Sequence, residues 1–190
     1  MLTLLAVVGA VLFGIYGPSV AGRSGLGGGI PLGDLVDAAA AKVNEAAVID
    51  MQQTDATDLA AEEARGLIQR HLGRSLRPPD LDELGYGLRQ VLPVSPPGAG
   101  YRGVAVLYRG RAEQAGRWVM LMLTPDDGEY LTFDSLGRPR PLVPDTTYEG
   151  ELPAQAGGPA AALAWSDGTL LRVACVERSE EHTSELQSPY

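Results

Sequence analysis

The spacing of apolar residues changes twice along this chain. Residues 2–20 form one uncharged and mostly apolar run. From Leu32 to Met51, apolar residues recur every three or four positions, which predicts a helix with one apolar face. The residues of this face are Leu32, Leu35, Val36, Ala39, Ala40, Val43, Ala46 and Ala47. From about Tyr86 onward the period falls to two, which predicts strands.

A second helix is predicted within the stretch TDATDLAAEEARGLIQRHLG, residues 54–73. Asp55 or Thr57 is expected to cap its start, and Gly73 is the residue type that commonly ends a helix. Acidic side chains near the start and basic ones near the end complement the helix dipole. These charged residues are Asp58, Glu62 and Glu63, then Arg70, His71 and Arg74. The predicted buried face consists of Leu59, Ala64, Leu67, Ile68 and Leu72.

Six strands are predicted in the second half of the chain. They are Tyr86–Val94, Gly103–Arg109, Arg117–Thr124, Glu129–Phe133, Ala160–Ser166 and Thr169–Val176. The segments SPPGAG, GRAEQAG and PDDG join the first four in succession, and Asp167-Gly168 suits a type I′ turn between the last two. Such short connections imply antiparallel neighbours. The expected fold is therefore α+β: an N-terminal transmembrane helix, two helices, then a five- or six-stranded antiparallel sheet.

A long segment, residues 135–159, separates the fourth predicted strand from the last hairpin and contains five prolines. It exceeds the usual length of an unstructured connection inside a domain. We expect this segment to be a functional or a mobile loop.

The N-terminal apolar run has the length of a membrane span. A helix of nineteen residues rises roughly 28 Å, close to the thickness of the hydrocarbon core. The alternative is a signal peptide cleaved after Ser19-Val20-Ala21, but no basic residue precedes the run. We favour a transmembrane anchor over residues 1–21, a glycine-rich linker over 22–31 and an extracytoplasmic domain over 32–177.

Composition narrows the classes of function. The net charge is -9, which argues against a nucleic-acid-binding surface. Cys175 is the single cysteine, which excludes an internal disulfide and a multi-cysteine metal site. Because it lies within an apolar strand, we interpret it as a small core residue.

No catalytic, cofactor-binding or metal-binding residue is assigned from the sequence. His71 is interpreted as a charge at a helix end, since no metal-ligand or His-carboxylate spacing surrounds it. The cluster Asp80, Asp82 and Glu83 offers carboxylates for acid-base chemistry or calcium, but it lacks the EF-hand pattern and is interpreted as a solvated turn capped by Asp80. Ser166 lacks the flanking glycines of a nucleophile elbow.

One group of arginines stands out around the predicted hairpin of residues 103–124. Its members are Arg102, Arg109, Arg111 and Arg117. Two interpretations are open. The group binds an anionic ligand, or, as we favour from the sequence alone, it keeps exposed strand edges soluble.

The segment LIQRHLGRSLRPPDLDELGYGLRQVLPV resembles the extracytoplasmic domain of membrane-spanning anti-sigma factors, also called transmembrane transcriptional regulators. The matching residues are Leu72, Gly73, Arg74, Pro79, Asp80, Leu81, Gly85 and Tyr86. The strands GVAVLYR and RWVMLMLTP and the hairpin LAWSDGTLLRVA, with Trp165, Asp167 and Gly168, extend the likeness over residues 30–177. The family's cytoplasmic zinc-type sigma-binding domain is not visible in this sequence, and residues 135–159 look longer than is typical.

The resemblance implies a non-enzymatic sensor or regulatory domain that controls sigma-factor-dependent transcription. It implies a single-pass bacterial inner-membrane protein with a periplasmic domain and no cofactor. Its partners would be the membrane, envelope proteins and a regulatory protease, with a sigma factor bound only through an upstream domain. The alternatives are an exported envelope or adhesive module, and an exported hydrolase that uses the Asp80, Asp82 and Glu83 cluster.

The last thirteen residues, RSEEHTSELQSPY, follow an apolar run without any turn signal. Back-translated in frame, RSEEHTSELQS resembles a common short-read sequencing adapter. We therefore expect residues 178–190 to be adapter sequence and the natural chain to differ after Glu177. On this interpretation the chain is a fragment, and His182 is not a candidate site residue.

Overall fold

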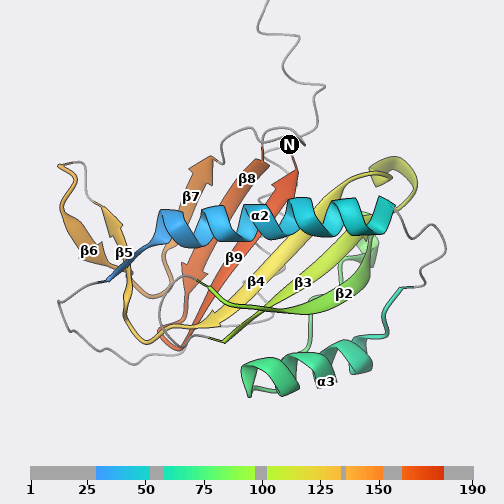
Figure 1. Cartoon of the computed structure of the whole chain (residues 1–190), viewed down its shortest axis with the longest axis horizontal. Coiled ribbons are helices and arrows are strands. Elements are labelled where there is room, and N and C mark those ends of the chain that lie inside the picture. Colours follow the sequence, from blue (N-terminus) through green and yellow to red (C-terminus); the bar gives the residue numbers. More distant parts are fainter. Residues whose placement is uncertain (1–28, 52–57, 97–101, 134–135, 152–159, 178–190) are drawn as a thin grey trace, which may run out of the picture.

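A six-stranded antiparallel sheet organises the chain (Figure 1). The computed structural model describes residues 29–51, 58–96, 102–133, 136–151 and 160–177. The strands of this sheet, in spatial order, are β2 (Tyr86–Val94), β3 (Gly103–Gly110), β4 (Trp118–Pro125), β9 (Leu170–Glu177), β8 (Ala160–Ser166) and β7 (Thr147–Glu151). The α+β class and the six-stranded antiparallel sheet are thus confirmed, although the membership of the sheet differs from the prediction.

One helix packs on each face of the sheet. Helix α2 (Leu32–Met51) crosses one face, and α3 (Ala61–Leu72) lies against the other (Figure 1). Strand β4 contributes side chains to the cores on both faces of the sheet. Met120 and Met122 belong to the core under α2. Val119, Leu121 and Leu123 belong to the core under α3. Because side chains alternate along a strand, burial on both faces requires the continuous apolar run of this strand.

Both predicted helices are present. Helix α2 has the predicted bounds, and its residues Leu32, Leu35 and Ala39 are buried. In α3, the buried residues are Ala64, Ile68 and Leu72, and Gly73 ends the helix with a φ of 73° and an N–H bonded to the oxygen of Gln69.

The start of α3 differs from the prediction. The helix begins at Ala61, so Asp58 precedes it and does not belong to its first turn. The predicted caps Asp55 and Thr57 lie outside the described residues.

Residues 73–85 form a strap that crosses the sheet on the α3 side. At its start the guanidinium of Arg74 donates to the hydroxyl of Thr169 at 3.1 Å, and at its end the N–H of Arg111 donates to the carbonyl of Gly85 at 2.7 Å. Between these points Leu81 is buried, and the hydroxyl of Tyr108 donates to the carbonyl of Pro79 at 3.0 Å. The Pro79-Asp80-Leu81 element therefore serves to cover the core.

A second, three-stranded sheet stands beside the first. It pairs β1 (Ile30–Pro31) in parallel with β5 (Tyr130–Phe133), which pairs antiparallel with β6 (Pro139–Pro141). The expectation that β4 and β5 form a hairpin is wrong, because β4 pairs with the distant β9. The expected long loop, residues 135–159, also contains β6 and β7.

The turn between β8 and β9 is centred one residue later than predicted. The N–H of Asp167 donates to the carbonyl of Leu170 at 3.3 Å, so Gly168 and Thr169 occupy the centre of the turn. Gly168 has a φ of 80°, and Thr169 is not among the residues with positive φ. A type I′ turn needs positive φ at both central positions, so the predicted type is wrong.

Both termini of the sequence lie outside the described part of the chain. In that part, no helix is long and apolar enough to cross a bilayer. The expected anchor of residues 1–21 and the expected adapter sequence of residues 178–190 fall on residues that the structure does not describe. Ile30 and Pro31, at the end of the expected linker, lie in β1.

Candidate anion-binding site

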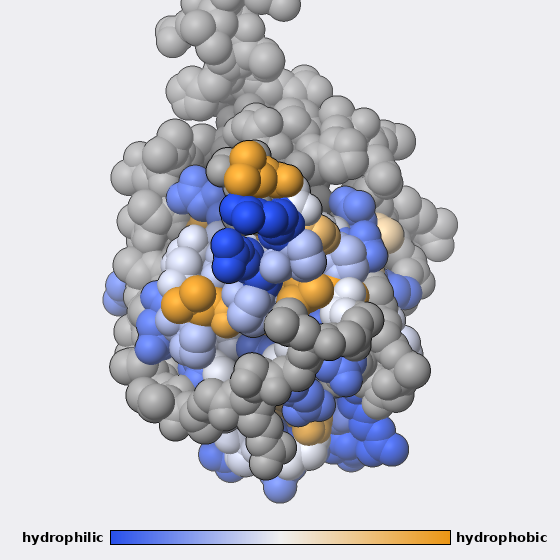
Figure 2. Space-filling model, turned by 90° about the vertical axis from the view of Figure 1, so that its left-hand side faces the viewer, coloured by the Kyte–Doolittle hydropathy of each residue, from blue (hydrophilic) through white to orange (hydrophobic). Residues whose placement is uncertain are grey.

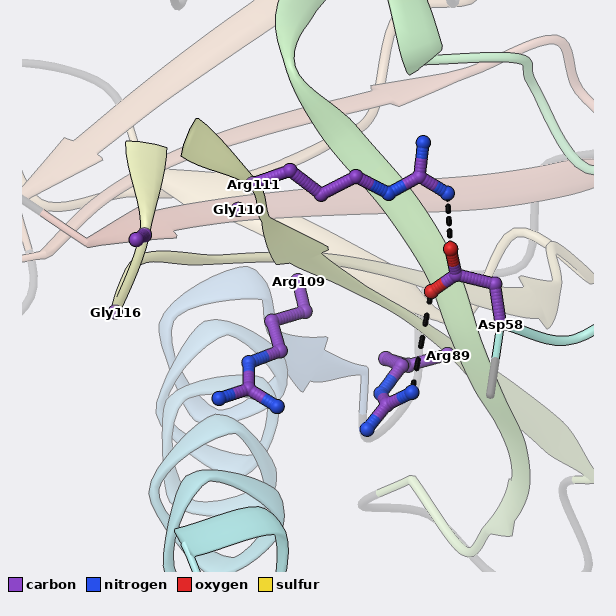
Figure 3. A pocket seen from close by; sticks show the side chains of 7 residues that line it. Asp58, Arg89, Arg109, Gly110, Arg111 and Gly116 are labelled. Atoms are coloured by element: carbon purple, nitrogen blue, oxygen red, sulfur yellow. Dashed lines mark hydrogen bonds and ion pairs between the residues drawn. The ribbon is translucent and has the colours of Figure 1, made fainter. Parts of the chain in front are cut away.

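A pocket of about 300 Å³ lies where β2 and β3 meet the turn between β3 and β4 (Figure 3). Its lining is dominated by three arginines and one carboxylate. The lining residues are Asp58, Arg89, Arg109, Gly110, Arg111, Ala115 and Gly116.

Arg89 enters the pocket because β2 contains a bulge. Leu88 is paired with Tyr108 and Gln90 with Leu107, so Arg89 is the extra residue on its strand. A bulge bends the strand and turns the side chain of the extra residue away from regular alternation. The Arg89 residue is only 8% exposed, so a cation is held at the buried side of the pocket.

Asp58 is fixed beside this bulge by the backbone. The N–H of Leu59 donates to the carbonyl of Leu88 at 2.8 Å, which ties the residues before α3 to the outer edge of β2. The carboxylate of Asp58 then lies between two guanidinium groups: it is 3.9 Å from that of Arg89 and forms a hydrogen-bonded ion pair with Arg111 (Figure 3).

Arg111 closes the outer side of the pocket. Its guanidinium lies across Gly87, where a Cβ atom would approach its nitrogens and carbon to 2.4–2.7 Å. It also donates to Asp82 at 3.0 Å. The hydrogen bond with Asp58 raises the pKa of Arg111 above its ordinary value, so the side chain stays a cation.

The turn after β3 forms a firm wall. The N–H of Gly110 donates to the carbonyl of Arg117 at 2.8 Å, and a Cβ at Gly110 would lie 1.8 Å from the carbonyl oxygen of Gln114. Only glycine permits so close an approach of backbone to backbone. Arg117 is held beside this wall by a hydrogen bond to the side chain of Gln114 at 2.9 Å.

The charges of the pocket favour an anion. Three guanidinium groups and the carboxylate of Asp58 line the pocket, and the carboxylate of Asp82 pairs with Arg111 from outside the lining, so these five side chains together carry an excess of one positive charge. A guanidinium presents its N–H donors in a planar fork that matches carboxylate and phosphate oxygens. The arrangement suits the binding of a small ligand that carries one of these groups.

The structure separates the four arginines that the sequence grouped together. Arg109 and Arg111 line the pocket, and Arg117 flanks it. Arg102 lies at the opposite end of β3, so it is not part of the site. Arg89 was missed, because a bulge gives no local signal in the sequence beyond a break in the alternation of β2.

The acidic cluster and Ser166 have structural partners. The carboxylate of Asp80 accepts the N–H of Asp82 at 3.0 Å, at the start of the short 3-10 helix Asp82–Leu84. The N-cap residue of this helix is Leu81, so Asp80 lies one residue before the cap position predicted for it. The hydroxyl of Ser166 donates to the carboxylate of Asp126 and accepts the N–H of Gly168 at 2.9 Å. His71 lies in the last turn of α3, as predicted.

Cys175 is a core residue, as expected: burial raises the pKa of its thiol to about 12. Within the described residues, no group of three or more His, Cys, Asp or Glu side chains is arranged to hold a metal ion. Comparison of the chain with protein-family models, with curated proteins and with solved structures gave no match.

Proposed function

We propose that this chain is a membrane-anchored extracytoplasmic regulatory domain of the anti-sigma type, and that it responds to an anionic ligand held in the arginine pocket. The anchor rests on the apolar run of residues 2–20. The regulatory role rests on the resemblance of residues 72–86 to anti-sigma factor domains. The proposal of an anionic ligand rests on one observation. The buried cation Arg89 is placed by a bulge in β2 next to Arg109 and Arg111.

Ligand binding at this site would affect the rest of the domain through backbone hydrogen bonds that begin at the pocket residues. Asp58 is tied to β2 through Leu59, and Arg111 is tied to the strap through Gly85. An anion that draws Arg111 away from Asp58 would therefore act on the start of α3 and on the strap together. Such a coupling supports a sensor that converts ligand binding into a change in the stability of one helix.

Ligand binding is tested with the full chain in detergent or nanodiscs. Phosphate, sulfate and citrate are added at constant ionic strength, and the thermal midpoint is measured. Saturation at 100 times Kd stabilises a protein by about 2.7 kcal/mol, so binding raises the midpoint. We expect Arg89→Gln to abolish this rise and Arg70→Gln, an exposed position on α3, to retain it. Equal responses in both variants would remove the pocket from the proposal.

The regulatory role is tested at the natural locus. The proposal expects the reading frame upstream of the Met1 codon to encode a zinc-type sigma-binding domain, with a sigma-factor gene adjacent. Deletion of the gene should then raise the transcripts of one sigma regulon. An in-frame stop just before Met1, with no sigma-factor gene nearby, would overturn the regulatory role and leave the pocket untouched.

A further inference from the structure

The outward face of the small sheet is apolar. In the β5–β6 hairpin, Leu131 is opposite Pro141 and Phe133 is opposite Pro139, so these four residues share one face. The other face carries Tyr130, which is fully buried in the core under α2. A hairpin with one side in the core normally turns polar residues outward. This hairpin turns apolar residues outward instead.

The exposed large hydrophobic side chains of the described residues gather on and around this hairpin. Phe133 is 52% exposed, Leu136 72% and Val143 57%. Pro139 and Pro141 are exposed as well. We call these five residues, together with Arg138 and Arg140, the hairpin patch. Figure 2 shows hydrophobic and strongly hydrophilic residues side by side on this side of the molecule.

The two arginines of the patch alternate with its prolines along β6, the edge strand of the small sheet, so Arg140, which is opposite Thr132, leaves the strand on the other face from Pro139 and Pro141. Both Arg138 and Arg140 are exposed. A long arginine side chain can keep its stem on apolar surface while its guanidinium contacts phosphate oxygens. Aromatic and aliphatic side chains beside arginines are the composition of surfaces that lie in the membrane interface.

The course of the chain places this patch close to the expected anchor. The described chain begins at Gly29, and the N–H of Ile30 donates to the carbonyl of Glu129 at the start of β5. Only residues 22–28 separate Gly29 from the expected anchor of residues 1–21. Seven residues span at most about 25 Å when extended. The small sheet is therefore the part of the domain that the anchor would hold nearest to the bilayer.

We propose that the hairpin patch lies on the surface of the membrane in which the chain's own N-terminal segment is anchored, with Phe133 and Leu136 in the interface and Arg138 and Arg140 at anionic headgroups. This inference rests on the anchor of the proposed function. It fixes the orientation of the domain: the small sheet faces the bilayer, while α3 lies on the far face of the main sheet.

The test uses the full chain with Phe133→Trp, reconstituted in vesicles of phosphatidylcholine with about 30% phosphatidylglycerol and brominated acyl chains. The two native tryptophans, Trp118 and Trp165, are 6% and 4% exposed, so the new side chain is the accessible probe. We expect brominated lipid to quench its emission about twofold. The control Glu63→Trp, exposed on α3, should remain unquenched.

Two further measurements separate the possible failures. Adding Arg138→Glu and Arg140→Glu to Phe133→Trp should restore most of the lost emission, because the repelled hairpin leaves the interface. A chain that floats with vesicles at high salt but shows no quenching of Phe133→Trp would overturn the patch and leave the anchor standing. A chain that does not float with vesicles at all would overturn the anchor, and the patch with it.

Discussion

The carboxylate of Asp167 accepts a hydrogen bond from the guanidinium of Arg172 at 2.7 Å, and the two side chains are 12% and 3% exposed. The same carboxylate accepts the N–H groups of Thr169 and Leu170, each at 2.9 Å. Asp167 thus both holds the β8–β9 turn and balances a buried cation.

We expect Asp167→Asn to be strongly destabilising. Asparagine keeps the size of the side chain but leaves the buried guanidinium of Arg172 without its counter-charge. Breaking a buried pair on one side typically costs about 3–5 kcal/mol. Urea unfolding measures this loss, and the double variant Asp167→Asn with Arg172→Met should recover a large part of it. A loss below about 1 kcal/mol in the single variant would contradict the assignment.

The stability contributed by Asp167 should depend on pH. Burial alone would raise the pKa of Asp167, but hydrogen bonds from Arg172 and Thr169 outweigh it and hold the pKa below the ordinary 3.8. The folded state therefore releases this proton more readily than the unfolded state. The contribution is complete above pH 3.8 and is lost as the pH falls through the lower folded pKa. The difference in unfolding free energy between wild type and Asp167→Asn should shrink over that acidic range.

The helices and several strands could be predicted because the apolar residues of each recur with the period of a helix or of a strand. The bounds of α2, β2 and β8 match the sequence prediction, and Gly73 ends α3 as expected. Helix period, strand alternation and a left-handed glycine are properties of neighbouring residues.

The pairing of strands could not be predicted in the same way. β4 has β3 on one side, as its short turn implies, but β9 on the other, about fifty residues further along the chain. The short PDDG connection predicted β5 there. Nothing local distinguishes these partners, since each offers apolar residues. The lining of the pocket could not be predicted for a similar reason, because Arg89 enters the pocket only through a bulge in β2.

Cys175 should not react with thiol reagents in the folded protein. Its thiol is buried in the core under α2, and burial raises its pKa to about 12, so the reactive thiolate is scarce at neutral pH. We expect no modification by Ellman's reagent in native buffer and one equivalent in urea. Rapid native labelling would mean that β9 opens readily at its C-terminal end.

Two glycines around α3 should respond with opposite sign to alanine. Gly66 lies inside the helix with nothing within 4 Å of a new Cβ, so Gly66→Ala should stabilise by roughly 0.5–1 kcal/mol. Gly73 also has space, but its φ is 73°, a conformation that alanine adopts only with strain. Gly73→Ala should therefore destabilise by about 1 kcal/mol. Thermal unfolding of both variants measures these changes in stability. If both changes have the same sign, the role of Gly73 as the left-handed residue that ends α3 is contradicted.

Gly87→Ala should alter the pocket without unfolding the domain. Its Cβ would lie 2.4–2.7 Å from the guanidinium of Arg111, and this is the far end of a flexible side chain, so the arginine moves while β2 stays in place. Arg111 would lose Asp58 and Asp82, but both ion pairs are exposed to solvent and contribute little to stability. The unfolding free energy should stay within about 1 kcal/mol of the wild-type value, while the affinity for phosphate or citrate changes several-fold. Unchanged affinity would show that Arg111 is not a ligand of the anion and would restrict the site to Arg89 and Arg109.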